Sequence, residues 1–305
     1  MTAAMFFKDY LGDAIATSIG VEGRIVNPYK PCTYEDMIYS AERLELRYPG
    51  HITRSSIGES VLGKDIPLLM LGHGEKKILI TASIHGTEHI TTSYVLYAVE
   101  EIFREQSEDI LSALKEVTVY IVPMANPDGV QKAIDTGENW RANENGVNLN
   151  KNFPTSVWSC IDTEIYRSDR ANYKGDSAGS EPETKALMKL CEENDFLFNI
   201  NFHVKGELVF WVDDLTGVMP GASALAKKIA ASTGYAVEPM TVSVNDYGGG
   251  FENWFRQKYN RTGLCVEMTP LTNDIFPHDN KDFDELVWDK TKNLLPDIIK
   301  HANRK

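Results

Sequence analysis

The 305-residue chain is 42% hydrophobic and 25% charged, a composition typical of a globular protein. Its 44 acidic and 31 basic residues give a formal net charge of −13, which argues against a nucleic-acid partner, because such proteins usually carry a basic face. The longest apolar stretches, such as residues 78–80, are far too short to span a bilayer, and residues 1–13 lack the basic start and apolar run of a secretory signal. We therefore expect a cytoplasmic location, without membrane contact or a partner protein, and leave release by a non-classical route open.

Strand-like and helix-like segments alternate from Thr33 onward, whereas residues 1–32 show no clean periodicity and are left unassigned. Thr33 and Asp36 predict a capping box that opens a helix ending near Arg47. The strands that we expect are residues 52–57, 66–71, 77–83, 117–122, 196–203, 208–212 and 264–268. The further helices that we expect are residues 91–104, 184–193, 222–233, 251–259 and 283–302.

The order of these segments predicts a single α/β domain, residues 33–305, built on a mixed, mostly parallel twisted sheet with helices on both faces. Ser180 and Glu183 predict a second capping box, and Pro296 is expected to kink or split the closing helix. Residues 125–172 are polar and rich in Asn, and we expect them to form one long loop.

The four cysteines, Cys32, Cys160, Cys191 and Cys265, are scattered along the chain without CxxC spacing. This pattern argues against a disulfide framework and against a thiolate zinc cluster. Cys191 and Cys265 lie within apolar segments, and we interpret them as small core residues.

Polar residues with metal-binding chemistry stand where apolar runs end. In residues 83–88, His85 and Glu88 are three positions apart, at the point where an expected strand is followed by an expected helix. In open α/β sheets, ligands bind at this carboxyl edge of the strands. His203 closes another apolar run, and Glu267 is an acid within an apolar strand. Zinc accepts imidazole nitrogen and carboxylate oxygen, and a buried carboxylate with a raised pKa suits a general base.

At this point the sequence resembles the zinc carboxypeptidase family, the carboxypeptidase A-like peptidases, from about Thr33 to the C-terminus. The order and spacing of several motifs match the family. The motifs that carry the resemblance are HGTE at residues 85–88, PMANPDG at 123–129, GVNLNKNF at 146–153, YKG at 173–175, SEPET at 180–184, FH at 202–203 and VE at 266–267.

The resemblance implies a catalytic apparatus in residues 33–305. His85, Glu88 and His203 would hold one zinc ion per chain. Glu267 would take a proton from the attacking water, and Arg141 would polarise the scissile carbonyl and stabilise its oxyanion. Zinc as a Lewis acid and a fixed cation near the oxyanion are chemically consistent with this scheme, and no covalent nucleophile is needed.

Three positions depart from the family pattern. Asn150 and Lys151 stand where most relatives carry the Asn-Arg pair that grips a terminal carboxylate, so carboxylate binding is expected to be looser or differently aimed. Asn148 stands where many relatives have an Asp that orients the first zinc histidine. The mobile tyrosine of the family maps by spacing onto Asn245, whereas the nearby tyrosine is Tyr247, which we take as the candidate catalytic residue.

The segment FHVKGELVFW, residues 202–211, is similar to the FHxxGExxxW stretch of the bacterial branch that cuts γ-D-glutamyl-diaminopimelate bonds in cell-wall peptides. A peptide or muropeptide substrate is therefore expected. Lys205, Glu207 and Glu252 are candidate contacts for the carboxylates and the ammonium group of such a substrate.

Other interpretations of the sequence remain open. The scaffold also suits another carboxypeptidase, an acyl-amino-acid amidohydrolase or a deglutamylase of proteins. A non-catalytic, zinc-retaining binding protein is a third class, kept open by Asn148 and Lys151. The presence of the three ligand candidates together with Arg141 and Glu267 counts against it.

Overall fold

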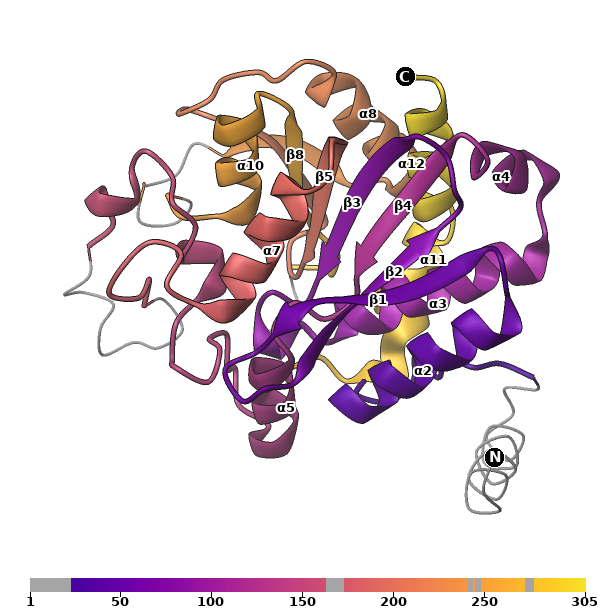
Figure 1. Ribbon diagram of the computed structural model, residues 1–305, viewed down its shortest axis with the longest axis horizontal. Coiled ribbons are helices and arrows are strands. Elements are labelled where there is room, and N and C mark those ends of the chain that lie inside the picture. Colours follow the sequence, from indigo (N-terminus) through magenta and orange to yellow (C-terminus); the bar gives the residue numbers. More distant parts are fainter. Residues whose placement is uncertain (1–22, 163–172, 241–243, 245–247, 272–276) are drawn as a thin grey trace.

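An eight-stranded mixed sheet forms the centre of the molecule (Figure 1). The computed structural model describes residues 23–162, 173–240, 244, 248–271 and 277–305. The strands are β1 (Ile52–Glu59), β2 (Asp65–Leu71), β3 (Lys76–Ala82), β4 (Val117–Val122), β5 (Phe196–His203), β6 (Leu208–Asp213), β7 (Ala236–Met240) and β8 (Thr262–Glu267). Their order across the sheet is β1-β2-β4-β3-β5-β8-β6-β7.

The middle of the sheet is parallel and its margins are mixed. Strand β3 pairs in parallel with β4 and with β5, and β5 pairs in parallel with β8. The pairs β1–β2, β2–β4 and β6–β8 are antiparallel, and the edge strand β7 is parallel to β6. The expected single α/β domain with a mostly parallel mixed sheet is confirmed.

Helices cover both faces of this sheet (Figure 1). They are α2 (Tyr34–Arg47), α3 (Ile90–Glu105), α4 (Glu108–Ala113), α5 (Pro127–Thr136), α7 (Pro182–Glu192), α8 (Ala222–Thr233), α10 (Phe251–Tyr259), α11 (Asp289–Thr291) and α12 (Leu294–Asn303). None of the helices in the described part of the chain is long and apolar enough to cross a membrane.

Alternate residues of the central strands belong to two hydrophobic cores on opposite faces of the sheet. In β3, Ile78 and Ile80 belong to the core cluster that includes residues of α2, α3, α8 and α12, whereas Leu79 belongs to the second cluster, which includes residues of α7 and α10. Burial on both faces follows from the period-two alternation of strand side chains, because each face is covered by helices. The sheet is therefore rigidly enclosed, and polar groups at its carboxyl edge have a fixed frame.

Of the predictions made for the ends of helices, one capping box and the split of the closing helix are confirmed, and the other capping box is wrong. The capping box of Thr33 and Asp36 forms as predicted. The second predicted box is wrong, because Glu181 occupies the N-cap of α7 and its side chain makes no capping bond, while the Ser180 hydroxyl bonds Glu181 instead. The closing helix is split as expected: a π-helical turn and α11 end before α12 begins, and Pro296 lies in the first turn of α12.

The long polar segment after β4 is not one irregular loop. Asn126 caps α5 through a hydrogen bond from the Gly129 amide to its side chain, with Pro127 in the first helical position. Short 3-10 turns follow at Leu149–Lys151 and Trp158–Cys160. The predicted loop thus contains a helix that packs on the turn after β3.

Candidate active site

The site begins at the carboxyl end of β3, where the chain leaves the sheet. Ser83 has a left-handed backbone with φ of 49°, and its amide and hydroxyl bond the hydroxyls of Thr91 and Thr92 at the start of α3. Gly86 lies so close to α5 that a Cβ there would come within 2.2 Å of the Gly129 carbonyl oxygen. The turn that carries the first two ligand candidates therefore requires glycine and is held from two sides.

Two further polar side chains come from the neighbouring strands. His203 ends β5 and Glu267 ends β8, and the two residues are directly opposite each other in the parallel register. Because β3 pairs with the other edge of β5, the carboxyl ends of three parallel strands meet at one place.

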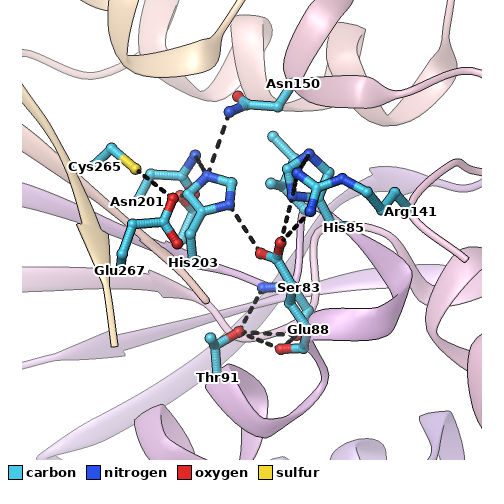
Figure 2. Close-up of polar contacts among 12 residues, drawn as sticks. Ser83, His85, Glu88, Thr91, Arg141, Asn150, Asn201, His203, Cys265 and Glu267 are labelled. Carbon is cyan, nitrogen blue, oxygen red and sulfur yellow. Dashed lines mark hydrogen bonds and ion pairs between the residues drawn. The ribbon is translucent and has the colours of Figure 1, made fainter. Parts of the chain in front are cut away.

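One carboxylate lies between two imidazoles at this edge. The Nδ1 atom of His85 is 2.8 Å from Glu88 Oε1, and the Nδ1 atom of His203 is 2.9 Å from Glu88 Oε2 (Figure 2). Ligand atoms of the three residues all lie within 4.8 Å of one another. Two imidazole nitrogens and a carboxylate are the donor set of a catalytic zinc site that keeps one position open, so the residues fit the metal.

The outward nitrogens of both histidines meet side-chain amides. The Nε2 atom of His85 is 3.1 Å from Asn148 Oδ1, an acceptor for the proton that a metal-bound histidine carries on its other nitrogen. The Nε2 atom of His203 is 2.9 Å from Asn201 Nδ2. Asn148 can thus perform the orienting task expected of an Asp, without the negative charge.

Burial and charge set the protonation of this cluster. Burial, together with the Arg141 guanidinium, lowers the pKa of His85 to about 3. Burial also opposes charge on His203, but Glu88 outweighs it and raises the pKa of His203 to about 9. Burial disfavours the Glu88 carboxylate, but the two histidines and Arg141 hold its pKa well below the usual value. The site therefore offers a charged carboxylate and a neutral imidazole to a cation.

Glu267 lies in a different environment from Glu88. Its Oε1 atom accepts a weak hydrogen bond from the thiol of Cys265 at 3.7 Å, and its buried Oε2 atom has no hydrogen-bond partner among the described residues. Burial raises the pKa of Glu267 to about 7, against the opposing effect of His203. A carboxyl group with this pKa can exchange a proton near neutral pH.

A cavity of about 190 Å³ opens onto these groups. Arg141 reaches in from one side, with its Nη1 atom 3.1 Å from Glu88 Oε1 and its side chain 30% exposed. The Arg141 guanidinium thus contacts the same carboxylate that would hold a metal. The cavity is lined by His85, Arg141, Asn148, Asn150, Lys151, His203, Met240, Glu252, Cys265 and Glu267.

Amide contacts fix the loop that carries Asn148, Asn150 and Lys151. The Oδ1 atom of Asn150 accepts a hydrogen bond from the Phe251 amide at 2.8 Å, which ties the loop to the start of α10. Earlier in the loop, the Asn143 side chain donates to the carboxylate of Glu181, the N-cap residue of α7, at 2.7 Å and to that of Glu183 within α7 at 3.0 Å. Lys151 is consequently buried at the cavity wall and held there.

Some predicted site residues lie elsewhere. Glu207 pairs with Lys290 at 2.5 Å, and neither Glu207 nor Lys205 lines the cavity. Their positions give no support to a role in substrate binding. Tyr247 and Asn245 lie outside the described residues.

Sequence reasoning passed over three residues that the structure brings to the site: Asn201, Met240 and Cys265. Asn201 and Cys265 precede His203 and Glu267 by two positions, so they share the same strand faces. That spacing was the available signal. Cys265 is buried as expected, but it borders the cavity and is not merely a core residue.

Comparison with known proteins agrees with this geometry. Residues 37–292 match the family model described as zinc carboxypeptidase, so the chain belongs to the zinc carboxypeptidase family, whose members are zinc-dependent hydrolases. It is 28% identical over 281 residues to gamma-D-glutamyl-L-diamino acid endopeptidase 1 of Lysinibacillus sphaericus, a match that covers 83% of this chain and 69% of that protein.

Two solved structures illustrate the shared fold. Bovine thrombin-activatable fibrinolysis inhibitor, in complex with tick carboxypeptidase inhibitor, superposes with a TM-score of 0.78 and 18% identity over 91% of this chain and 99% of that chain. Murein-tripeptide amidase MpaA from Escherichia coli O157 gives a TM-score of 0.54 and 23% identity over 81% of this chain and 91% of that chain.

Proposed function

We propose that the catalytic domain, residues 33–305, hydrolyses the γ-D-glutamyl-diaminopimelate bond of cell-wall peptides. The family assignment supports hydrolysis of an amide bond, and the relative from Lysinibacillus sphaericus is named for γ-D-glutamyl-L-diamino acid substrates. The observation that carries the choice of substrate is the charge pattern of the cavity. It places two cations, Arg141 and Lys151, in one cavity with the buried carboxylate of Glu252.

In this proposal His85, Glu88 and His203 hold zinc, and the metal supplies a Lewis acid that makes water nucleophilic near neutral pH. Glu267 accepts the proton of the attacking water, which suits its raised pKa and the partnerless Oε2 atom. The Arg141 guanidinium donates hydrogen bonds to the carbonyl oxygen as negative charge develops there.

Recognition of the diamino acid then falls to groups around the cavity. Lys151 is a point charge that suits a carboxylate without the two-point geometry of an arginine. Asn150 lies beside it and can donate from its amide nitrogen. Glu252 is 3% exposed and suits an ammonium group, since a buried carboxylate is costly without a positive partner.

The test compares kcat/KM of the zinc-loaded enzyme for L-Ala-γ-D-Glu-diaminopimelate and for a hippuryl dipeptide ending in an aromatic residue. We expect the tripeptide to be preferred by at least about tenfold, because its ammonium group can contact Glu252 in addition to the carboxylate contact with Lys151. The variant Glu252→Gln should lose most of this preference and keep its zinc. Preference of the wild type for the dipeptide would show that the chain is an ordinary carboxypeptidase.

A further inference from the structure

Each residue of the YKG motif contacts the loop that forms one wall of the cavity. The Tyr173 carbonyl oxygen accepts a hydrogen bond from the Asn148 amide at 2.7 Å, and the Lys174 carbonyl oxygen accepts one from Asn152 Nδ2 at 2.9 Å. Gly175 has φ of 88°, and a Cβ there would come within 2.8 Å of the same Asn152 nitrogen, so this contact requires glycine. The motif therefore holds the loop at two points along its length.

The ammonium group of Lys174 is buried and faces the 3-10 turn that follows this loop. Its Nζ atom lies 3.0 Å from the Trp158 carbonyl oxygen, 2.6 Å from the Ile161 carbonyl oxygen and 4.1 Å from the centroid of the Trp158 ring system. A cation over the face of an indole is attracted by the ring, and the attraction is stronger where water is excluded. Lys174 is not among the described residues that line the cavity, so its charge holds the turn and does not face a substrate.

Trp158 connects this turn to the main chain of Lys151. Its Nε1 atom donates a hydrogen bond to the Lys151 carbonyl oxygen at 3.0 Å. The Lys151 amide donates to the Asn148 carbonyl oxygen at 2.9 Å, and a Cβ on Gly249 would come within 2.2 Å of the Lys151 carbonyl oxygen. Both peptide groups of Lys151 are thus restrained, which fixes the point from which its side chain reaches the cavity wall.

Lys151 needs such a frame because nothing in its own chemistry sets its direction. A lysine ammonium is a point charge on a flexible stem and lacks the planar fork that orients an arginine. The 3-10 turn of Leu149–Lys151 is only three residues long, and such turns have poor hydrogen-bond geometry of their own. Contacts from outside the turn therefore determine where the ammonium group of Lys151 lies.

We propose that Lys174 and Trp158 are positioning residues for carboxylate recognition: the Lys174 ammonium fixes the Trp158 indole, and the indole N–H fixes the main chain of Lys151. The inference rests on the proposed function, because it takes Lys151 as the group that contacts the substrate carboxylate. It adds two residues outside the cavity that determine the strength of that contact.

The experiment measures binding of Nα-acetyl-L-lysine and Nα-acetyl-L-lysinamide to the zinc-loaded full chain by isothermal titration calorimetry. The probes differ only in that a neutral amide replaces the carboxylate, so the ratio of their Kd values measures carboxylate recognition. We expect the wild type to bind the carboxylate probe about tenfold more tightly than the amide probe.

Single variants test each link of the chain of contacts. Trp158→Phe keeps an aromatic ring for the Lys174 ammonium and loses only the N–H donor, and it should lower the ratio about threefold. Lys174→Met should lower the ratio by a similar factor, whereas Lys174→Arg should stay near the wild type, because a guanidinium also stacks on the ring and donates hydrogen bonds. Lys132→Met is the matched control: it removes an ammonium group 3.9 Å from the centroid of the Trp140 ring system and should leave the ratio unchanged.

A double-mutant cycle distinguishes positioning from general damage. Lys151→Met should bring the ratio close to one, and adding Trp158→Phe to that variant should then leave the Kd of both probes unchanged. A purely structural role of Trp158 would instead weaken both probes, with or without Lys151. Circular dichroism checks that each variant is folded.

The inference is overturned if Trp158→Phe keeps the wild-type ratio, if it weakens both probes equally, or if Lys151→Met retains the preference for the carboxylate. The probes lack a γ-D-glutamyl bond, so none of these results bears on whether that bond is cleaved. Conversely, failure to cleave the tripeptide would refute the proposed function, while the Kd ratios would still report how Lys151 is positioned.

Discussion

Helix α10 contributes residues to two buried ionic clusters. The pKa of a carboxyl group is lowered in one cluster and raised in the other. In the first, both oxygens of Asp213 are saturated: Oδ2 accepts from Asn253 and Arg256, and Oδ1 accepts from the amides of Leu215 and Thr216. Burial disfavours this charge, but Arg256 and the other donors outweigh it and hold the pKa of Asp213 below its usual value.

The second cluster is the candidate active site, where Glu267 has one weak donor and a raised pKa of about 7. Asp213 is fixed in its charged form, whereas Glu267 is poised between charged and neutral forms. Burial is common to both carboxylates, so their neighbours determine the difference: the Arg256 charge and several donors lower the pKa of Asp213, whereas Glu267 has one weak donor and the like charge of Glu88 nearby. The comparison teaches that a saturated buried carboxylate serves stability and an unsaturated one beside a cavity serves chemistry.

The largest expected effect is at the metal ligands. His203→Ala should abolish stoichiometric zinc and all zinc-dependent activity while the circular dichroism spectrum stays that of the wild type, because one of three protein ligands is lost. Metal analysis after gel filtration measures the zinc content. The exposed His51 supplies a control, since His51→Ala should keep one zinc per chain. A full equivalent of zinc in His203→Ala would remove His203 from the site.

The second largest expected effect is on stability, at the cluster around Asp213. Asp213→Ala leaves the Arg256 charge buried without its carboxylate, and should lower the free energy of unfolding by about 3–5 kcal/mol. Because the pKa of Asp213 is lowered on folding, its contribution is present at neutral pH and is lost as the pH falls through the acid range. Urea denaturation at pH 7 measures the change. Asp195→Ala, which alters a mostly exposed carboxylate, should change stability by no more than about 0.5 kcal/mol. Equal losses in both variants would contradict the distinction.

The smallest effect concerns carboxylate recognition. Lys151→Arg restores a planar, bidentate donor at the cavity wall and should shift preference toward substrates with one terminal carboxylate by about tenfold. The ratio of kcat/KM for the hippuryl dipeptide and the γ-D-glutamyl tripeptide measures this shift. An unchanged ratio would mean that Lys151 does not contact the substrate carboxylate.

The sequence predicted the strand ends that build the site better than the loops between them. His85, His203 and Glu267 were identifiable because each is a polar residue that interrupts or closes an apolar run, and the structure brings them to one edge of the sheet. Asn201 was not singled out and Cys265 was interpreted only as a core residue, because strands buried on both faces show no polar alternation that separates site from core.

Elements with weak local patterns were missed for different reasons. Strand β7 is a largely exposed edge strand that contains Pro239, which is typical of an edge but weakens a strand prediction. Helix α5 begins with the recognisable pair Asn126-Pro127, but the polar residues that follow it concealed its length. The misplaced capping box at α7 arose because Glu181, not Ser180, precedes the helical Pro182.

The most direct test of the central claim is turnover by zinc-replete Glu267→Gln. Because only the proton acceptor changes, we predict one zinc per chain and a fall of about 10³-fold in kcat for the tripeptide. In the wild type, activity should be lost below pH 7, because Glu267 becomes protonated. The positive charge of bound zinc should lower the midpoint of this loss. The residual activity of the variant should not show this loss at acidic pH. Near-normal turnover by a variant with a full equivalent of zinc would contradict the assignment of Glu267 as the base.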